Sequence, residues 1–394
     1  MCCRDFWKYL LRKDTPSNHC NGELTKVHYI CFSFKLLVKR VLIAPLDWGL
    51  GHATRCIPVI QWLVNRKIDV RVAGNGPSLR LLEKEFPFIP QSELPDYSPR
   101  YPAGKGMVTA MALQLPRFLH VISAEHKAVE KIVQQNRIDL VISDNRYGCW
   151  TSLARCIFIS HQSNIMMPKR FGWLGPMVRW MNERYVRKFD TCWIPDHPEG
   201  SLAGSLISFG KRGFHPDVRY IGPLSRFTPA IDRDVPHYDI VGVCSGPEPQ
   251  RSIFERILRD QLQRSGKRFL LIRGVLDGEP TLNADARIVD YLTTQTMEKV
   301  LKGAGIVVAR SGFSTVMDLN VLGKKAIFVP TPGQTEQEYL AEKMMNEKVA
   351  FYMRQESFDL TGALAESAKY TGFAGAEMNK NLDRLLSELF PYER

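Results

Sequence analysis

The chain has 394 residues, of which 44% are hydrophobic and 24% are charged. This balance is typical of globular proteins and excludes a disordered, collagenous or wholly coiled-coil chain. Lys and Arg number 53 against 41 Asp and Glu, so the formal net charge is +12. Such an excess suits an anionic partner, whether a phosphate ligand, an acidic membrane surface or nucleic acid, although a solvated basic surface would explain it equally well.

Cysteine usage and apolar runs indicate the compartment. The nine cysteines have no CxxC pair and no regular spacing, which indicates neither a disulfide framework nor a zinc module. No apolar run approaches the ~20 residues that a transmembrane helix needs, and no secretory signal is apparent at the N-terminus. We therefore expect a cytoplasmic protein. Residues 1–38 have no sustained periodicity, so we treat them as an N-terminal extension and exclude them from the fold.

Short apolar runs alternate with amphipathic stretches in the first half of the chain. Runs of this kind are typical of parallel strands that are buried on both faces. We predict strands at 40–46, 68–74, 138–144, 156–162, 191–196 and 217–224, and helices at 53–67, 77–86 and 107–135.

The same alternation restarts after a stretch rich in proline and charge at 226–238, which we interpret as a linker. We predict strands at 239–246, 267–274, 305–312 and 324–330, and helices at 251–263 and 335–348. Two such runs indicate an α/β protein with two doubly wound, Rossmann-like domains, 39–225 and 239–394, that face a central cleft. The last helix is expected to pack back on the N-terminal domain. Ligands of such sheets bind at the carboxyl ends of the strands, where motifs should therefore lie.

The first motif is DWGLGHATR at 47–55, between a strand and a helix. Gly49 and Gly51 permit a tight turn and a close approach of the backbone to a ligand. The start of the following helix offers free N–H groups to an anion or a sugar oxygen. His52 lies at this point, and a neutral imidazole could accept a proton from a hydroxyl group. A tight turn with a capping histidine would give the same pattern.

The second motif is the longest, ARSGFSTVMDLNVLGKKAIFVPTPGQTEQEY at 309–339. A strand ends at its first residue, a turn follows, and a helix begins whose N–H groups could hold a diphosphate. Asp318 lies one turn into this helix, where a carboxylate can accept hydrogen bonds from both hydroxyls of a ribose. An ordinary turn with a surface aspartate is the alternative. The candidate diphosphate ligands are Arg310, Ser311, Gly312, Phe313, Ser314 and Thr315.

Two further loops complete the candidate donor site. Ser245 and Gly246 follow the first strand of the second domain and could contact phosphate, unless they only form a proline-stiffened loop. Gln334 and Gln337 follow a later strand, where the hydroxyls of a bound sugar would lie. A polar first turn of a helix would look the same.

Together these motifs resemble a known family. GLGHATR, followed some 250 residues later by RSG-x-ST-x-x-D, G-x-x-A-I-F-V-P and Q-x-x-Q, is similar to the GT-B glycosyltransferases. The closest resemblance is to the MurG-like, family 28 nucleotide-sugar transferases, and within them to a microbial branch with the LGHATR opening. The resemblance implies that 310–315 bind the diphosphate of a UDP-sugar and that the glutamines bind its sugar. Asp318 stands where the family usually has a ribose-binding Glu, and Glu338 stands where the family has a second adjacent Gln.

The reaction that this resemblance implies is a single displacement at the anomeric carbon, with inversion of configuration. His52 is the favoured base and Asp144, at the end of a predicted strand, is its competitor. Helix N-termini could stabilise the charge that grows on UDP, so no metal or other cofactor is expected. Asp232 and Asp234 form a DxD pair, but they lie in the linker and are interpreted as solvated.

A fourth feature is the basic and aromatic segment 166–193. Basic side chains interleaved with Trp and Tyr on a helix suit an anionic membrane interface, and a core helix with a basic outer face is the alternative. A peripheral position at the inner face of the cell membrane would suit a lipid-linked acceptor. No nucleic-acid-binding motif is present, so no nucleic-acid partner is expected.

The sequence therefore predicts an inverting glycosyltransferase that moves a sugar, N-acetylhexosamine by preference, from a UDP-sugar to a glycolipid or cell-envelope hydroxyl. One rival hypothesis is a UDP-sugar epimerase of the same fold class, which needs no acceptor. Another is a nonenzymatic binder of glycans or anions.

Overall fold

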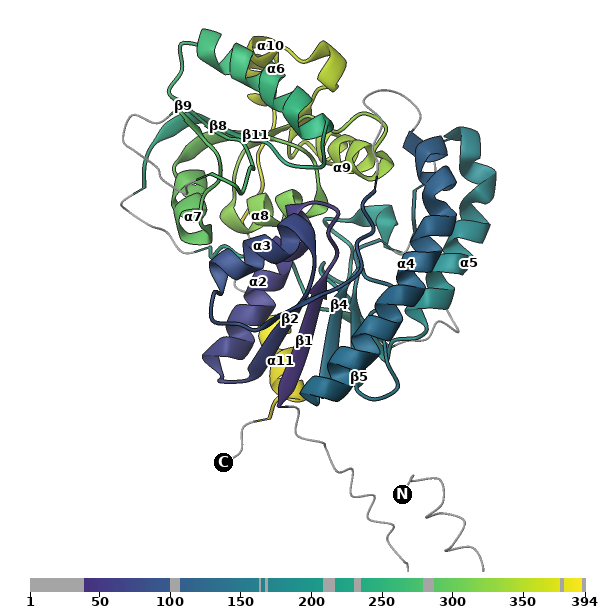
Figure 1. Ribbon diagram of the computed structural model, residues 1–394. Helices are drawn as coiled ribbons and strands as arrows, with labels where there is room; N and C mark the ends of the chain where they lie inside the picture. Colours follow the sequence, from purple (N-terminus) through teal and green to yellow (C-terminus); the bar gives the residue numbers. More distant parts are fainter. Residues whose placement is uncertain are drawn as a thin grey trace, which may run out of the picture. The chain divides into compact units, whose positions relative to one another are not determined.

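The computed structural model describes residues 39–99, 107–162, 164–166, 169–207, 217–229, 235–278, 287–375 and 379–391. The N-terminal extension and the DxD pair lie outside these residues. Within them, two fully parallel sheets carry the fold (Figure 1). This confirms the predicted fold class of two Rossmann-like α/β domains.

The first sheet has the strand order β3-β2-β1-β4-β5-β6-β7. The strand order reverses between β1 and β4, which are neighbours in the sheet although β2 and β3 separate them in the sequence. These two strands pair in register, with Pro45 beside Asp144. The strands are β1 (Arg40–Pro45), β2 (Asp69–Gly74), β3 (Gln91–Glu93), β4 (Leu140–Asp144), β5 (Arg155–Ile159), β6 (Thr191–Ile194) and β7 (Asp217–Tyr220).

The second sheet has the order β10-β9-β8-β11-β12-β13 and reverses in the same way between β8 and β11. Val243 lies beside Ala309 at the carboxyl ends of this central pair. Both sheets therefore have a topological switch point, which is where doubly wound proteins bind their ligands. The strands are β8 (Tyr238–Val243), β9 (Phe269–Ile272), β10 (Ile288–Val289), β11 (Ala304–Ala309), β12 (Ala326–Phe328) and β13 (Phe351–Tyr352).

Helices cover both faces of each sheet, because side chains alternate along the buried strands and both sets are apolar. On the first sheet, α2 (Leu50–Asn65) and α3 (Gly76–Glu85) pack on one face and α4 (Met107–Asn136) and α5 (Gly175–Val186) on the other. On the second sheet, α7 (Thr294–Lys302), α8 (Phe313–Leu322) and α9 (Thr335–Asn346) oppose α6 (Gln250–Arg264) and α10 (Leu360–Ser367).

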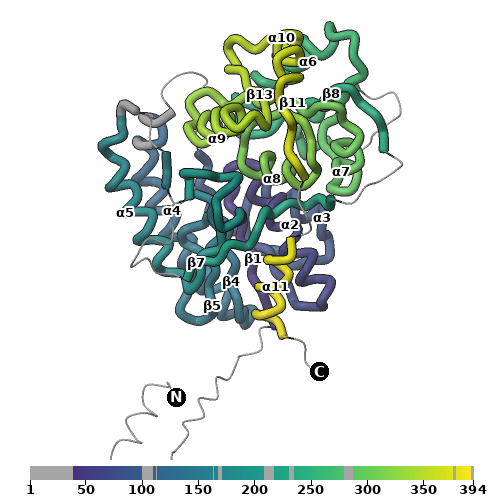
Figure 2. Tube along the Cα trace, turned by 180° about the vertical axis from the view of Figure 1, so that it is seen from behind, coloured from purple at the N-terminus to yellow at the C-terminus, as the bar shows by residue number. Residues whose placement is uncertain are grey.

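The two halves are joined by a continuous apolar core and by polar contacts across the seam between them. Ser314 Oγ donates to the carbonyl of Gly51, over 2.8 Å. Thr335 Oγ1 donates to the carbonyl of Met166, also over 2.8 Å. The seam therefore brings the start of α2 against the start of α8, and both tracings of the chain show these elements together (Figures 1 and 2).

The last helix, α11 (Lys380–Leu389), returns to the first half of the chain. Trp62 of α2 donates from its indole N–H to Asp383 over 2.7 Å, and its ring contacts Phe390. In Figure 2 this yellow helix lies beside the first sheet.

The predicted strands and helices all occur, with ends that shift by one to three residues for most of them. Sequence analysis missed β3, β10, β13, α7 and α10. The missed strands have only two or three residues each, which is too short for a periodic signal.

Candidate active site

The glycine loop after β1 brings His52 to the seam. Gly49 precedes α2 with φ at +106°, a conformation that favours glycine. Gly51 lies in the first turn of α2, and a Cβ there would come within 2.9 Å of Ser314 Oγ. The absence of a side chain at Gly51 therefore permits the close approach of α2 and α8. His52 follows directly and is partly buried.

His52 and Asp144 meet because β1 and β4 are neighbours. His52 Nδ1 lies 3.1 Å from Asp144 Oδ1, and His52 Nε2 has no hydrogen-bond partner within the described part of the chain. Arg55, one turn further along α2, donates two hydrogen bonds to the same carboxylate. Its Nε donates to Asp144 Oδ2 over 2.5 Å, and its Nη2 donates to Asp144 Oδ1. Asp144 is fully buried, so no acceptor hydroxyl can reach it directly.

The charges around His52 fix the protonation of the pair. Burial would raise the pKa of the Asp144 carboxyl, but Arg55 and His52 together hold it well below its usual range. Burial and the neighbouring Arg55 lower the pKa of His52, against an opposing effect of Asp144. At neutral pH the imidazole is therefore uncharged and can accept a proton.

The Arg55 guanidinium extends this network across the seam. Its Nη1 lies 2.9 Å from His161 Nδ1, and His161 Nε2 lies 2.9 Å from Glu336 Oε1. Glu336 belongs to α9 in the second half of the chain. The ring of His161 also stacks on Phe313 with a centroid distance of 4.3 Å and an angle of 5° between the planes.

The start of α8 forms a candidate anion site. The helix begins at Phe313, as predicted, and Gly312 before it supplies no side-chain cap. The first N–H groups of a helix have no partner within the helix, so those of Phe313, Ser314 and Thr315 are directed at the seam. Ser311 is buried and donates from its hydroxyl to the carbonyl of Gln337 over 2.7 Å, so its side chain fixes the loop.

Arg310 is held by groups of the surrounding loops. Its side chain is buried and faces away from the start of α8, over the ring of Phe254. Its Nη1 donates to the carbonyls of Val329 and Pro330, and its Nη2 donates to Gln250 and Gln355. These groups hold both terminal nitrogens, so the Arg310 side chain braces the loops around the site, and its assignment as a phosphate ligand stays a prediction.

Asp318 lies on α8 beside the linker. Its Oδ1 accepts a hydrogen bond from Ser225 Oγ over 2.6 Å. Burial raises the pKa of Asp318 to about 6, in spite of the opposing effects of Arg226 and Ser225. The carboxylate is only partly buried and one oxygen has no partner in the described chain, so it retains the capacity to accept from a ribose hydroxyl.

The remaining predicted donor residues line two loops. Ser245 and Gly246 follow β8, and a Cβ on Gly246 would meet nothing within 4 Å, so this loop borders open space. Gln337 donates from its Nε2 to Gln334 Oε1 and accepts from the Thr331 N–H over 2.8 Å. Both glutamines are thus held by their own loop and reach a sugar only through their remaining polar atoms.

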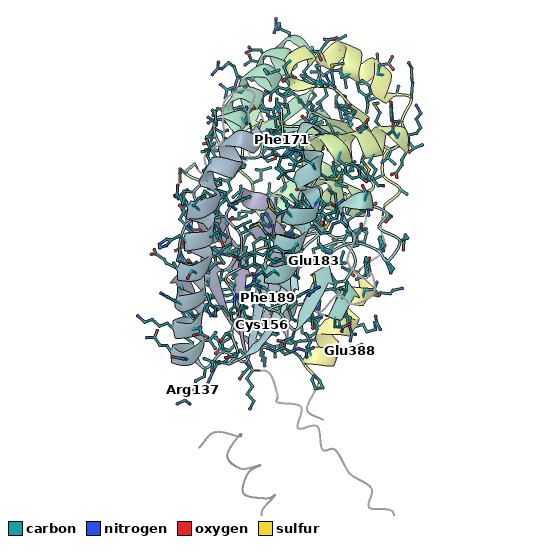
Figure 3. All side chains as sticks on the ribbon, turned by 90° about the vertical axis from the view of Figure 1, so that its right-hand side faces the viewer. Arg137, Cys156, Phe171, Glu183, Phe189 and Glu388 are labelled. Carbon is teal, nitrogen blue, oxygen red and sulfur yellow. The ribbon has the colours of Figure 1, made fainter. Side chains whose placement is uncertain are left out.

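The segment 166–193 has both an exposed and a buried part: Val186 and Phe189 lie in the core of the first domain, whereas several aromatic and apolar side chains before them are exposed. Trp173 is 77% exposed and Trp180 is 61% exposed, and Met177 lies between them along the chain. Helices α4 and α5 lie side by side, and Figure 3 looks onto this face. A cavity of about 470 Å³ opens beside α5, lined by Asn164, Ile165, Met166, Gly172, Gly175, Pro176, Arg179, Trp180 and Glu183.

Sequence reasoning missed Arg55 and Glu336, although both stand within the quoted motifs. A charged residue on the core-facing side of α2 was the available signal for Arg55. Nothing in the sequence paired Glu336 with His161. No group of His, Cys, Asp and Glu suited to a metal ion occurs among the residues that the structure describes, and no described helix has the length and apolarity to cross a membrane.

Comparisons with known proteins bear on the fold and on the class of reaction. The profile of the glycosyltransferase family 28 C-terminal domain matches residues 259–382. A protein of Methanosarcina acetivorans named "Uncharacterized glycosyltransferase" is 24% identical over 334 residues, which cover 76% of this chain and 81% of that protein. The UDP-N-acetylglucosamine--N-acetylmuramyl-(pentapeptide) pyrophosphoryl-undecaprenol N-acetylglucosamine transferase of Pasteurella multocida is 22% identical over 317 residues, with coverage of 78% and 81%.

Among solved structures, MurG of Acinetobacter baumannii superimposes with a TM-score of 0.52 at 15% identity, covering 89% of this chain and 98% of that one. The structural similarity establishes the fold, and the sequence matches establish sugar transfer as the activity. The nonenzymatic alternative is thereby set aside. The chain is a glycosyltransferase of the GT-B fold, and its residues 259–382 match the C-terminal domain of family 28.

Proposed function

We propose that the protein is an inverting transferase that uses a UDP-sugar, with UDP-N-acetylhexosamine preferred, and His52 as its base. The observation that carries this proposal is the meeting of His52 with the start of α8 at the seam, through Gly51 and Ser314. A base and an anion site at the same seam are what a direct displacement requires. The matched transferase of Pasteurella multocida is named for UDP-N-acetylglucosamine, which supports the choice of donor.

In this reaction the acceptor oxygen attacks the anomeric carbon while its proton passes to His52 Nε2. The bond between the anomeric carbon and the diphosphate oxygen breaks, and UDP leaves with the electron pair. For Nε2 to accept this proton, Nδ1 of His52 must carry a hydrogen and donate it to Asp144 over 3.1 Å. Arg55 Nη2 lies 2.9 Å from the same Nδ1 and can only donate, so in this protonation state Arg55 acts on the ring through its charge and makes no hydrogen bond to it. We therefore assign Asp144 to orienting His52 rather than to accepting the proton, because it is buried and held by Arg55.

The donor would bind with its diphosphate at the N–H groups of Phe313, Ser314 and Thr315 and its ribose at Asp318. The dipole of α8 favours the negative charge that develops on the leaving UDP, and no metal is invoked. Gln334 and Gln337 are assigned to the transferred sugar.

For the acceptor we propose a lipid-linked glycan at the inner face of the cell membrane. The exposed Trp173, Met177 and Trp180 can enter the headgroup region, while Arg179 and Arg184 supply positive charge on the same helix. A peripheral contact of this kind would present the seam to an acceptor that stays in the bilayer.

The test is isothermal titration of UDP, UDP-N-acetylglucosamine, UDP-glucose and GDP into the protein, followed by assays of sugar transfer. The expected result is micromolar binding of the UDP species, weakened in Asp318→Ala. His52→Gln should keep UDP affinity but lose about 10²- to 10⁴-fold in transfer rate, whereas the exposed His237→Gln should change neither.

Binding of GDP alone would contradict the donor assignment. Conversion of the UDP-sugar to its epimer without an acceptor would favour the epimerase instead. Full transfer by His52→Gln would remove His52 as the base.

A further inference from the structure

The network that joins the two halves contains one carboxylate with no role in the proposed reaction. Glu336 reaches across the seam from the first turn of α9 to His161. The start of the same helix also carries Gln334 and Gln337, which are assigned to the donor sugar. Glu336 is therefore the point at which the donor-binding half touches the network around His52.

The partners of His161 fix its hydrogen positions. The Arg55 guanidinium can only donate, so His161 Nδ1 must accept from it over 2.9 Å. The remaining hydrogen lies on Nε2 and is donated to Glu336 over 2.9 Å. His161 thus connects a guanidinium to a carboxylate through its two ring nitrogens. The His161 side chain is buried and its ring is stacked on Phe313, so the directions of both hydrogen bonds are fixed.

The charge balance shows what Glu336 contributes. Asp144 and Arg55 form a two-pronged pair that cancels, and Arg55 also lies 2.9 Å from His52 Nδ1, where its charge opposes protonation of the ring. If both imidazoles are counted as neutral, the charges of Asp144 and Arg55 cancel, and the negative charge of Glu336 is the net charge of the network. Its pKa is lowered by His161, His52 and Arg55 in spite of its burial, so it is ionised at neutral pH.

We propose that Glu336, acting through His161 and Arg55, is a positioning residue that restores the basicity of His52 when the donor-binding half is docked on the seam. The inference rests on the proposed role of His52 as the base. Its consequence is that the helix carrying Gln337, which is assigned to the donor sugar, also contributes to the basicity of His52.

The test compares the pKa of His52 in the wild type and in Glu336→Gln by NMR titration of the full chain labelled at histidine. The signal of His52 is identified by its loss in His52→Gln. The titratable or charged groups that face His52 are Arg55 and Cys56 of α2, Asp144 of β4, His161 after β5 and Glu336 of α9. Glu342→Gln, an exposed change on the same helix, is the matched control.

Glu336→Gln should lower the pKa of His52 by about one unit, the effect of a unit charge roughly 10 Å away at an effective dielectric constant of about 20. Glu342→Gln should leave it unchanged. The sign is decisive, because a change that merely opened the seam would hydrate His52 and raise its pKa.

An unchanged or raised pKa of His52 in Glu336→Gln would overturn the inference. The titration needs neither donor nor acceptor, so it can be read even if no UDP-sugar is transferred, a result that would count against the proposed function alone. Where transfer is measurable, the acid limb of kcat/KM should move to lower pH in Glu336→Gln and return toward the wild type in Glu336→Asp.

Discussion

The buried pair of Asp144 and Arg55 provides a stability prediction that does not depend on the substrate. Asp144 is fully buried and Arg55 is 2% exposed, and two guanidinium nitrogens contact the carboxylate. Asp144→Asn keeps the shape of the side chain but leaves the Arg55 charge buried without its counter-ion. Removing one partner of a buried ion pair costs about 3–5 kcal/mol, since the remaining charge has lost its hydration and gains nothing in return.

That cost can be converted into an unfolding temperature. The described residues between 39 and 391 form one compact unit. At roughly 2.1 cal/mol/K of unfolding entropy per residue, a loss of about 4 kcal/mol lowers the unfolding temperature of a unit of some 350 residues by about 5 °C. Scanning calorimetry at a fixed heating rate would measure the change. Asp277→Asn is the control, because Asp277 is 76% exposed and lies 3.9 Å from Arg80, where a pair contributes little.

The pH dependence follows from the sign of the shift. The pKa of Asp144 in the folded chain lies below the ordinary value of 3.8, so its contribution is fully present above that value and is lost as the pH falls through the folded pKa. The difference between the wild type and Asp144→Asn should therefore be constant from pH 5 to pH 8 and shrink only below about pH 4.

A double variant separates the ion pair from simple packing. Arg55→Met in the Asp144→Asn chain removes the uncompensated charge, so the double variant should be no less stable than Asp144→Asn alone. A fall of less than 1 °C in Asp144→Asn, or a double variant that loses the sum of both single effects, would refute the reasoning.

Three further predictions concern the donor site and the exposed helix. Gly51→Ala should lower UDP affinity about fivefold, because the new Cβ would displace Ser314 Oγ and cost one hydrogen bond of about 1 kcal/mol. In titration calorimetry, the double variant Gly51→Ala with Ser314→Ala should bind UDP no more weakly than either single variant. Asp318→Asn should raise the unfolding temperature by about 2 °C above pH 6 and have no effect on it near pH 4. The reason is that a pKa of about 6 means that the folded chain disfavours the charged carboxylate. An equal gain in unfolding temperature at both pH values would contradict this. The double variant Trp173→Ser with Trp180→Ser should sediment less with vesicles of anionic phospholipid. Its unfolding temperature should stay unchanged, because both side chains are largely exposed. Unaltered sedimentation would argue against membrane contact.

The site could be located from the sequence because its signals are local. An apolar run, a glycine turn and a polar helix start occupy only a dozen residues, and the turn lies at the carboxyl end of a strand wherever the strand falls in the sheet. His52, Gly51 and the 311–315 turn all lie at the seam for this reason.

The direction of a side chain could not be predicted in the same way. Arg310 follows a strand like the other motif residues, yet its guanidinium faces inward because carbonyl groups of two loops, near residues 250 and 330, converge behind it. Those loops are 60 and 20 residues away in the chain. Glu336 escaped notice for a related reason, since its partner His161 is 175 residues distant.

The switch points explain how so few residues can define the site in a chain that is only 15% identical to its structural neighbour. In each sheet the two central strands carry the motifs, so their carboxyl ends are adjacent whatever residues fill the flanking strands. Packing of the two halves brings together the segments that follow β1 and β11, through Gly51 and Ser314, while His52 after β1 meets Asp144 at the end of β4. The outer strands and helices need only remain apolar to maintain this arrangement, whereas a side chain at Gly51 or a missing charge at Asp144 acts directly on the seam. Substitutions of similar volume in the outer strands should therefore affect stability far more than the position of His52 relative to α8.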